Sequence, residues 1–439
     1  MSNKINFPYD RVQAVDERET VLEWQGSGPV NNKEGALRLL RQASSSKIYI
    51  YHLDHEHDRI YTENLIEYLV SKGVLWRSIT LNAGGYRPEL QLCLDDGATA
   101  VLGYNSQLDH SWVQSGAFME AAERRGLPVL QWILDHPSTR WPEFRASTPT
   151  NSRFIFSSDH ARQYFEMHCL PGALTATAGG VGQNQRSRIG TLTKQDFMRR
   201  PFSCMIPLNL HRVRSMEENN RLLASLDAPL INVVLEAVGS ARNDLDNPIE
   251  THVTAALAIS SQIVSPDRFN SLCQIVEHSV QSIRRCKIFS IAKNFPVLIQ
   301  SDESAMPFVN GFSASLATNV SMQVTLARFP LCRAVLSVSP FSDMIHDRTK
   351  NALNAGCVAI VEDNQRSRSF LKHKINALLF RYDDDSLEQC LDIVCNQPEY
   401  AYEIAQGGFA LRDHPRMRFD RFENIIALAE HRVHPALQA

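Results

Sequence analysis

The chain has 439 residues, of which 44% are hydrophobic and 21% charged, and its formal net charge at pH 7 is −3. This length predicts two or three domains, and the nearly balanced charge argues against a general binder of nucleic acids or membrane surfaces. No apolar run approaches the ~20 residues that span a bilayer, and the nine cysteines form no CxxC pair. We therefore expect a soluble cytoplasmic protein with reduced thiols, no signal peptide and no transmembrane segment.

The first part of the chain predicts a parallel sheet covered by helices. Residues 1–45 are polar and form an N-terminal extension of uncertain structure. Beyond them, short apolar runs predict strands at 47–51, 75–81, 98–102, 128–134, 153–156 and 173–178. Helical apolar spacing between these runs predicts helices at 60–72, 112–125 and 160–169. This alternation implies a Rossmann-like domain over 46–185, which ends in a glycine-rich hinge that begins at Gly179.

The rest of the chain repeats the same rhythm. Strands are expected at 202–208, 287–291, 297–300, 334–338, 357–361 and 377–380. A helix-rich stretch is expected at roughly 215–285, and closing helices near 386–395, 398–406 and 419–432. We predict a second Rossmann-like domain over 186–415, and a C-terminal helix within 416–439 that packs back across the cleft. The expected fold class is α/β, with two Rossmann-like parallel-sheet domains that face a cleft.

The stretch from residue 339 to residue 363 has the pattern of an anion site. A buried strand, a polar loop, a helix from Asp347 and a stop at Gly356 follow one another. Free N–H groups at the start of such a helix favour a phosphate, and Arg348 adds a planar set of donors that matches phosphate oxygens. Glu362 and Asp363 end the next strand at the same edge. The alternative is that Asp347 and Arg348 are ordinary surface charges of a first helical turn.

Other polar groups follow strands of the first domain. Asp135-His136-Pro137 ends one strand, where His136 is a candidate general base on an acceptor hydroxyl, or else part of a structural turn. Tyr86 follows another strand in a glycine-containing turn and is a candidate for stacking on a sugar. The run 52–58 holds three histidines and three acids, but consecutive loop residues seldom converge on one ion. We therefore expect no metal site there.

Several of these motifs together resemble one family. The run His346-Asp347-Arg348-x-x-Asn351-Ala352-x-x-x-Gly356, followed by an apolar run to Asp363, resembles a segment of the CgeB-like glycosyltransferases, which are bacterial two-domain GT-B proteins. The turn Asp135-His136-Pro137 and the run Ile404-Ala405-x-x-Gly408 resemble two further segments of the family. The sequence departs from the pattern at Leu353-Asn354 and after His414.

The resemblance implies a metal-independent GT-B glycosyltransferase without a cofactor. Its co-substrate would be a nucleotide-diphosphate sugar, with a UDP-sugar expected, and its acceptor a hydroxyl on a protein, a glycan or a surface component rather than nucleic acid. The second domain would bind the donor and the first domain the acceptor. Catalytic roles would fall to His136 and Arg348. The donor diphosphate or ribose would contact His346, Asp347, Arg348 and Asn351. Sugar-side candidates are Glu362 and Asp363, and acceptor-side candidates are Tyr86, Asp135 and His136.

Two other interpretations of the function stay open at this point. A nucleotide-sugar epimerase on the same fold would convert its donor without any acceptor. A GT-B-like module without catalysis would bind a glycan or a protein instead, because a fold alone does not fix a reaction.

Overall fold

The computed structural model describes most of the chain beyond its first 45 residues. The described residues are 46–53, 56–81, 92–105, 116–140, 151–182, 190–209, 221, 223–224, 226–318, 320–339, 342–383 and 385–430. The expected N-terminal extension and the candidate Tyr86 lie outside these residues.

The first sheet consists of six parallel strands in the order β2–β1–β3–β4–β5–β6. They are β1 (Lys47–Leu53), β2 (Leu75–Leu81), β3 (Ala100–Tyr104), β4 (Val129–Ile133), β5 (Ser152–Phe156) and β6 (Leu174–Thr177). The helices between them include α2 (Glu56–Ser71), α4 (Gly116–Arg124) and α6 (Asp159–Tyr164), with short turns η1 (Pro137–Arg140) and η2 (Phe165–Cys169). The strand order reverses between β1 and β3, where sheets of this kind form a ligand crevice at their carboxyl ends.

The second sheet also has six parallel strands, in the order β9–β8–β7–β10–β11–β12. They are β7 (Phe202–Pro207), β8 (Leu298–Gln300), β9 (Ser315–Ala317), β10 (Cys332–Ser337), β11 (Val358–Glu362) and β12 (Leu378–Phe380). Counted along the chain, this is the 3-2-1-4-5-6 order of dinucleotide-binding sheets, and it reverses between β7 and β10. The strand pairing confirms the predicted α/β class with two Rossmann-like parallel-sheet domains.

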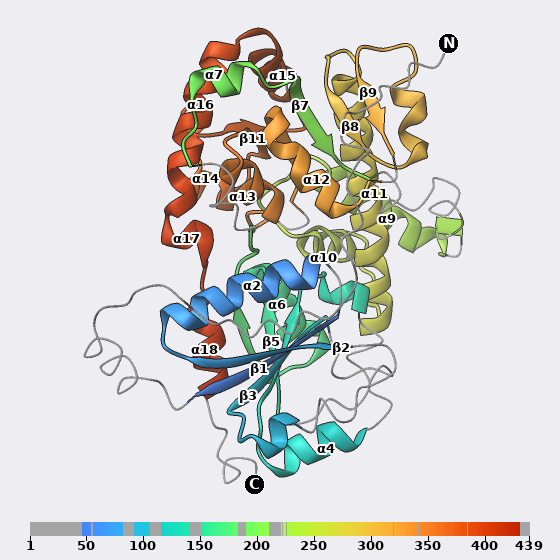
Figure 1. Cartoon of the computed structure of the whole chain (residues 1–439). Helices are drawn as coiled ribbons and strands as arrows, with labels where there is room; N and C mark the ends of the chain where they lie inside the picture. Colours follow the sequence, from blue (N-terminus) through green and yellow to red (C-terminus); the bar gives the residue numbers. More distant parts are fainter. Residues whose placement is uncertain are drawn as a thin grey trace, which may run out of the picture. The chain divides into compact units, whose positions relative to one another are not determined.

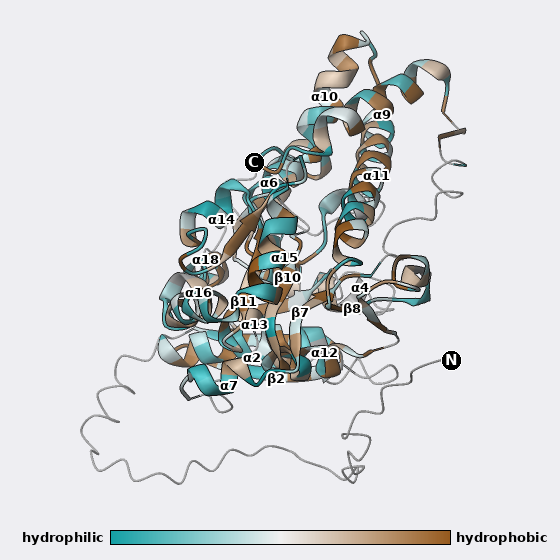
Figure 2. Ribbon diagram, turned by 90° about the horizontal axis from the view of Figure 1, so that it is seen from above, coloured by the Kyte–Doolittle hydropathy of each residue, from teal (hydrophilic) through white to brown (hydrophobic). Residues whose placement is uncertain are grey.

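Helices surround the second sheet, and the last helix of the described chain lies beside the first sheet (Figure 1). They include α7 (Lys194–Met198), α12 (Met322–Arg328), α13 (Asp347–Asn354), α14 (Gln365–Phe370), α15 (Ser386–Asn396), α16 (Pro398–Ala410), α17 (Pro415–Arg418) and α18 (Glu423–Glu430), with the turns η3 (Glu303–Phe308), η4 (Phe329–Leu331) and η5 (Leu411–Asp413). Figure 2 shows hydrophilic residues on helices such as α7 and α14. Among the described residues, no helix has both the length and the apolarity to cross a bilayer.

Among the described residues between β7 and β8, three helices form a unit that we call the helical insertion. It comprises α9 (Ala228–Ala241), α10 (Ile249–Ile259) and α11 (Pro266–Ala292). The prediction of a strand at 287–291 is wrong, because these residues belong to α11. One helical stripe of this segment is buried and contains Ile288, Phe289 and Ala292. The periodicity of such a short apolar run does not distinguish a strand from the end of a helix.

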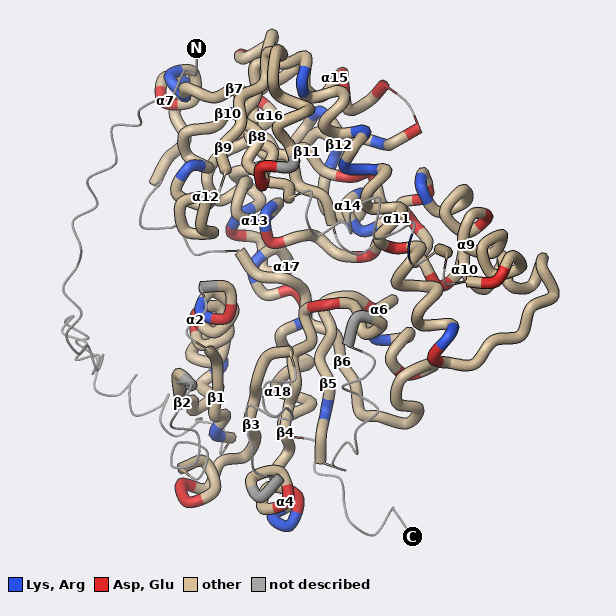
Figure 3. Tube along the Cα trace, turned by 90° about the vertical axis from the view of Figure 1, so that its right-hand side faces the viewer, with Lys and Arg blue, Asp and Glu red and all other residues tan. Residues whose placement is uncertain are grey.

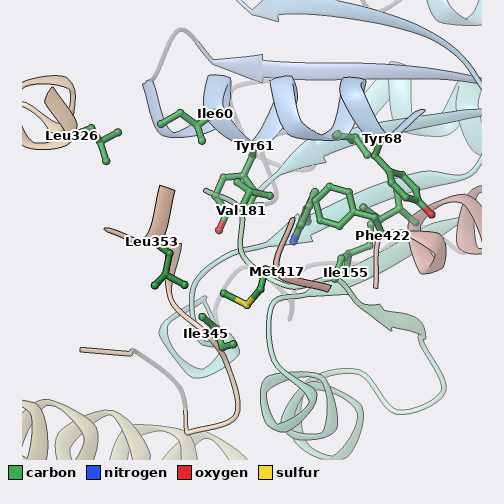
Figure 4. Close-up of a cluster of buried hydrophobic side chains, with 14 of the residues drawn as sticks. Ile60, Tyr61, Tyr68, Ile155, Val181, Leu326, Ile345, Leu353, Met417 and Phe422 are labelled. Atoms are coloured by element: carbon green, nitrogen blue, oxygen red, sulfur yellow. The ribbon is translucent and has the colours of Figure 1, made fainter. Parts of the chain in front are cut away.

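Side chains of the first sheet and of helices beside both sheets, among them Ile155, Tyr61 and Leu353, share one buried cluster (Figure 4). The ring of Tyr61 on α2 meets Trp132 of β4 edge-on at 5.2 Å between centroids. Trp132 in turn meets Phe422, just before α18, at 5.4 Å. The same cluster holds Val335 of β10 and Ala359 of β11. Burial of this apolar surface therefore stabilises both sheets together.

The end of the described chain returns to the first sheet. Helix α18 packs against β6 and β3. The side-chain amide of Asn424 donates to the carbonyl of Thr177 at 2.8 Å, and the buried guanidinium of Arg153 donates to the carbonyl of Leu428. The exact domain boundaries at 46–185, 186–415 and 416–439 stay predictions.

Candidate active site

The loop after β10 leads into α13 and shows how that helix begins. His346 is the N-cap residue, and the backbone N–H of Arg348 donates to Asp347 Oδ1 at 2.7 Å. The imidazole of His346 pairs with the same carboxylate oxygen. His57, which lies on α2 beside the first sheet, brings its Nε2 to 3.9 Å from the other oxygen of Asp347. The start of α13 thus already holds a carboxylate at the position where the sequence predicts a phosphate.

The charges at this helix start are strongly coupled. Burial would raise the pKa of Asp347, but His346, Arg348 and His57 hold it well below its usual value. Burial lowers the pKa of His346, and Asp347 partly opposes that shift. Figure 3 shows residues of both signs along α13. An incoming diphosphate would have to displace the Asp347 carboxylate from the N–H of Arg348, or bind through the side chains alone.

The remaining donor-side candidates have different surroundings. Asn351 is fully buried on α13, one turn beyond Asp347. The carboxylate of Glu362 accepts from the N–H of Ser339 at 2.7 Å and from the hydroxyl of Tyr382 at 2.8 Å, so it ties the loop after β10 to the end of β12. Asp363 instead pairs with an arginine of α14, Arg368, at 3.3 Å.

Contacts from the loop after β10 fix how the two sheets meet. One oxygen of the Asp343 carboxylate accepts from the backbone N–H groups of Asp159 at 2.7 Å and His160 at 3.1 Å, at the start of α6. The ammonium of Lys350 on α13 donates to the carbonyl of Gly180. Because that ammonium is buried, its pKa is lowered to about 8. The segments after β5, β6 and β10 are therefore held together by polar groups.

A pocket lies where the two sheets and the helical insertion meet, and we call it the cleft pocket. Its enclosed cavity has a volume of about 60 Å³, and it opens into a wider mouth that brings the total empty space to about 630 Å³. The residues that line it come from the segments after β4 and β5, from the helical insertion and from the segments after β10 and β11: His136, His160, Asp244, Leu245, Asn247, Pro248, Ile249, Glu250, Cys273, Glu277, Arg284, Ser339, Ser342, Glu362 and Asn364. It brings two predicted residues, His136 and Glu362, into one site.

The hydrogen bonds of His136 define its tautomer. The backbone N–H of Ser138 donates to Nδ1 of His136 at 3.2 Å, and the hydroxyl of Ser138 lies 2.8 Å from the same nitrogen. Because the backbone N–H can only donate, Nδ1 is assigned as an acceptor and the hydrogen of the neutral ring to Nε2. That Nε2 faces Oε2 of Glu250 at 3.9 Å. Burial lowers the pKa of His136 to about 4, so the ring is neutral at pH 7. Its neighbour Asp135 is half-buried and raises the pKa of Glu277.

Sequence reasoning missed Glu250 and Glu277. Glu250 stands in the first turn of α10, where an acid normally serves the helix dipole and carries no functional signal. Glu277 lies within the long helix α11. Burial raises the pKa of Glu250 and of Glu277 to about 7 in each case. Only the packing of the helical insertion against the first domain reveals them.

Replacing Glu277 should change how stability depends on pH. A carboxyl with a higher pKa in the folded state than in the unfolded state contributes stability at pH values below its unfolded-state pKa. That contribution is lost as the pH rises through its folded-state pKa. For Glu277 that window runs from 4.5 to about 7. At pH 8, Glu277→Gln should therefore be more stable than the unmodified protein by on the order of 2–3 kcal/mol and should unfold at a higher temperature. At pH 4 the two proteins should unfold at about the same temperature.

Thermal unfolding followed by circular dichroism at both pH values checks this. Glu236→Gln is the matched control, since Glu236 is exposed on α9 and its replacement should matter little at either pH. An equal effect of Glu277→Gln at pH 4 and pH 8 would show that the carboxyl is not destabilised by burial.

Comparison with known proteins gives distant structural likenesses. No protein-family model and no curated protein matches this chain. Among solved structures, a sucrose-phosphate synthase from Thermosynechococcus elongatus has 11% identity and a TM-score of 0.45 over 88% of this chain and 96% of that chain. Anabaena HepE, in complex with UDP and glucose, has 12% identity and a TM-score of 0.44 over 86% and 98%. A DNA-modifying β-glucosyltransferase has 8% identity and a TM-score of 0.46 over 88% and 99%. At TM-scores below 0.5 these likenesses assign no chemistry to this chain.

Proposed function

We propose that this protein is a GT-B glycosyltransferase of the CgeB-like type that moves a sugar from a nucleotide-diphosphate donor to an acceptor hydroxyl. The observation that carries the proposal is the placement of residues 339–363, the predicted donor segment. It follows β10, which borders the strand-order reversal of the second sheet, and its loop lines a pocket shared with the first domain. A bacterial, cytoplasmic enzyme and a UDP-sugar donor are further parts of the proposal.

The donor would lie along α13 and the loop before it. Arg348, which is half-buried at the second residue of α13, would bind the diphosphate, and His346 the diphosphate or the ribose. Asn351 would support them from the next turn. The leaving diphosphate would be neutralised by Arg348 and the helix start, without a metal ion. Glu362 and Asp363 stay proposals for the sugar side.

The acceptor would approach from the first domain. Asp135 and His136 follow β4, and His136 lines the cleft pocket. The acceptor hydroxyl could belong to a protein, a glycan or a surface component. Transfer requires that hydroxyl to lose a proton while the sugar leaves the diphosphate, so a proton acceptor is needed near the anomeric carbon if the reaction inverts configuration.

Donor binding is the direct test of this function. Sugars linked to UDP, GDP, CDP and dTDP are each added to the protein, and the unfolding temperature is measured. A donor at 100 times its dissociation constant stabilises the folded protein by about 2.7 kcal/mol, which raises the unfolding temperature measurably. Slow release of the nucleoside diphosphate by water would show turnover. Conversion of the donor to its epimer without acceptor would contradict transfer.

Arg348→Ala should reduce donor turnover by on the order of 10²- to 10³-fold, because one positioned donor to the leaving group is lost. Its unfolding temperature without donor should stay close to that of the unmodified protein. Arg124→Ala serves as the control, since Arg124 is exposed on α4 in the first domain. Turnover that is equal in Arg348→Ala and Arg124→Ala would contradict the assignment of Arg348.

A further inference from the structure

The cleft pocket is acidic. Four carboxyl groups line it, from Asp244, Glu250, Glu277 and Glu362, and Arg284 is the single arginine or lysine among its lining residues. Two of the three guanidinium nitrogens of Arg284, Nε and Nη2, donate to backbone carbonyls: those of residues 241, 242 and 244 accept at 2.9, 3.0 and 2.6 Å. An anionic ligand would therefore meet four carboxyls and a single guanidinium, most of whose donors are already used.

Most of these carboxyls already have partners within the protein. Glu362 accepts from Ser339 and Tyr382, as described above. Asp244 accepts from the N–H of Asp246 at 2.9 Å and from the side chain of Asn247 at 2.8 Å. Glu277 accepts from the amide of Gln281 at 3.0 Å. These three side chains therefore already have hydrogen-bond partners within the wall of the pocket.

Glu250 differs from the other three. Only 7% of this residue is exposed, and its Oε2 is buried without a hydrogen-bond partner among the described residues. Nε2 of His136 lies 3.9 Å from this oxygen, which is beyond hydrogen-bond length. A buried oxygen of this kind is costly unless something donates to it, so a ligand with a hydrogen to give would supply the missing partner.

We propose that the cleft pocket is the acceptor subsite of the transferase, that it takes an uncharged or cationic sugar-like group, and that Glu250 accepts the proton of the attacking hydroxyl. This inference rests on the proposed function. The acceptor oxygen forms a bond to the anomeric carbon of the donor sugar, and its proton passes to Oε2 of Glu250. The bond from that carbon to the diphosphate oxygen breaks, and its electron pair leaves with the nucleoside diphosphate.

The tautomer of His136 supports this division of roles. Its Nδ1 is occupied by the N–H of Ser138, and its Nε2 carries the hydrogen. In this state the ring can donate toward the carboxylate or the acceptor but has no vacant nitrogen to accept a proton. The proton-accepting role that the sequence suggested for His136 therefore passes to Glu250, and His136 becomes a donor beside it.

The test compares Glu250→Gln with the unmodified protein, using the sugar nucleotide that gives the largest thermal shift. The acceptor probes are p-nitrophenyl glycosides: neutral glucosides, amino-sugar glycosides and the anionic glucuronide. Glu250→Gln should lower kcat for transfer by about 10²-fold or more, because the general base is lost. Its thermal shift with the donor should stay unchanged. The unmodified protein should use the neutral and amino glycosides and reject the glucuronide.

The pH dependence gives a second readout. Transfer by the unmodified protein should fall as the pH drops below neutrality, since the pKa of Glu250 is raised to about 7 by burial, with Glu277 and Asp343 adding to the shift. His136 faces the same carboxyl, but its pKa near 4 places its titration well below this range. Glu250→Gln should remove that fall, whereas Glu236→Gln on the exposed face of α9 should retain it.

Three results would overturn the inference. They are full transfer by Glu250→Gln, equal use of the glucuronide, and a Glu250→Gln protein that loses donor binding together with transfer while it remains folded. If no sugar nucleotide binds the unmodified protein, the proposed function fails, and the subsite is judged by glycoside binding alone. Neutral glycosides that raise the unfolding temperature of the unmodified protein, but not of Glu250→Gln, would support the subsite. The absence of that difference would refute it.

Discussion

Gly407→Ala should destabilise the protein by several kcal/mol, although alanine is the better helix former. Gly407 lies on α16, and a Cβ atom there would stand 2.2 Å from the carbonyl oxygen of Ile375 and 3.3 Å from the Cα of Asn376. Both obstacles are backbone, so no flexible side chain can move aside. Intrinsic propensity alone would make the change favourable by about 1 kcal/mol, whereas overpacking against backbone typically costs 1–3 kcal/mol or more. A loss of stability would therefore show that overpacking against the backbone outweighs the helix propensity of alanine.

Gly239→Ala is the matched control for this prediction. Gly239 is an exposed glycine of α9, and a Cβ atom there would meet nothing within 4 Å. It should stabilise its helix by up to about 1 kcal/mol. Thermal unfolding of both variants measures the contrast. A Gly407→Ala protein at least as stable as the unmodified one would show that α16 does not approach residues 375–376 so closely.

The glycines of α16 also show what a motif can and cannot tell. The sequence singles out Gly408 through the run Ile404-Ala405-x-x-Gly408, which resembles a family segment. The structure gives a physical reason for it, because a Cβ atom at Gly408 would lie 2.7 Å from the carbonyl oxygen of Asn376. The tighter neighbour, Gly407, has no signal in the sequence. Close approach between two backbones depends on tertiary packing, which spacing along one helix does not encode.

The strands and the donor segment could be predicted, because parallel strands buried on both faces read as short apolar runs. Both β10 and β11 are such runs, and Gly356 ends α13 with a φ of +64°, the left-handed value for which glycine is suited. Which group accepts from the N–H of Arg348 at the start of α13 could not be predicted. The N–H of Arg348 is bonded by Asp347, whose placement depends on His346 and on His57 from another part of the chain.

The acceptor side shows the larger gap between sequence and structure. His136 stands out in the sequence because it follows a strand within a distinctive turn. Glu250 does not stand out, since an acid in a first helical turn is ordinary. Its importance comes from its distance to His136 and from a buried oxygen without a partner among the described residues, and both depend on how the helical insertion packs. Long insertions between strands therefore require a structure before their polar residues can be assigned.

Arg200→Ala should have the second large effect, because Arg200 holds the carboxyl end of α13. Its guanidinium donates to the carbonyl of Cys332 at 2.7 Å, of Ala355 at 3.0 Å and of Gly356 at 2.9 Å. Arg200 is buried, so its removal leaves these acceptors without their donor and away from water. Each unsatisfied carbonyl costs about 1–3 kcal/mol, and the helix end also loses a favourable positive charge. We expect a loss of about 3–5 kcal/mol.

This loss should be concentrated where Arg200 acts. Hydrogen exchange should accelerate in α13 and at the start of β10 more than in the first sheet, because the bonded carbonyls belong to those segments. Arg200→Lys should be intermediate, since an ammonium cannot span three separated acceptors as the planar guanidinium does. Arg199→Ala, which removes the exposed neighbour, should change neither stability nor exchange noticeably. If Arg200→Ala behaved like Arg199→Ala, α13 would be fixed by its apolar contacts alone. Its proposed donor residues would then keep their geometry without this arginine.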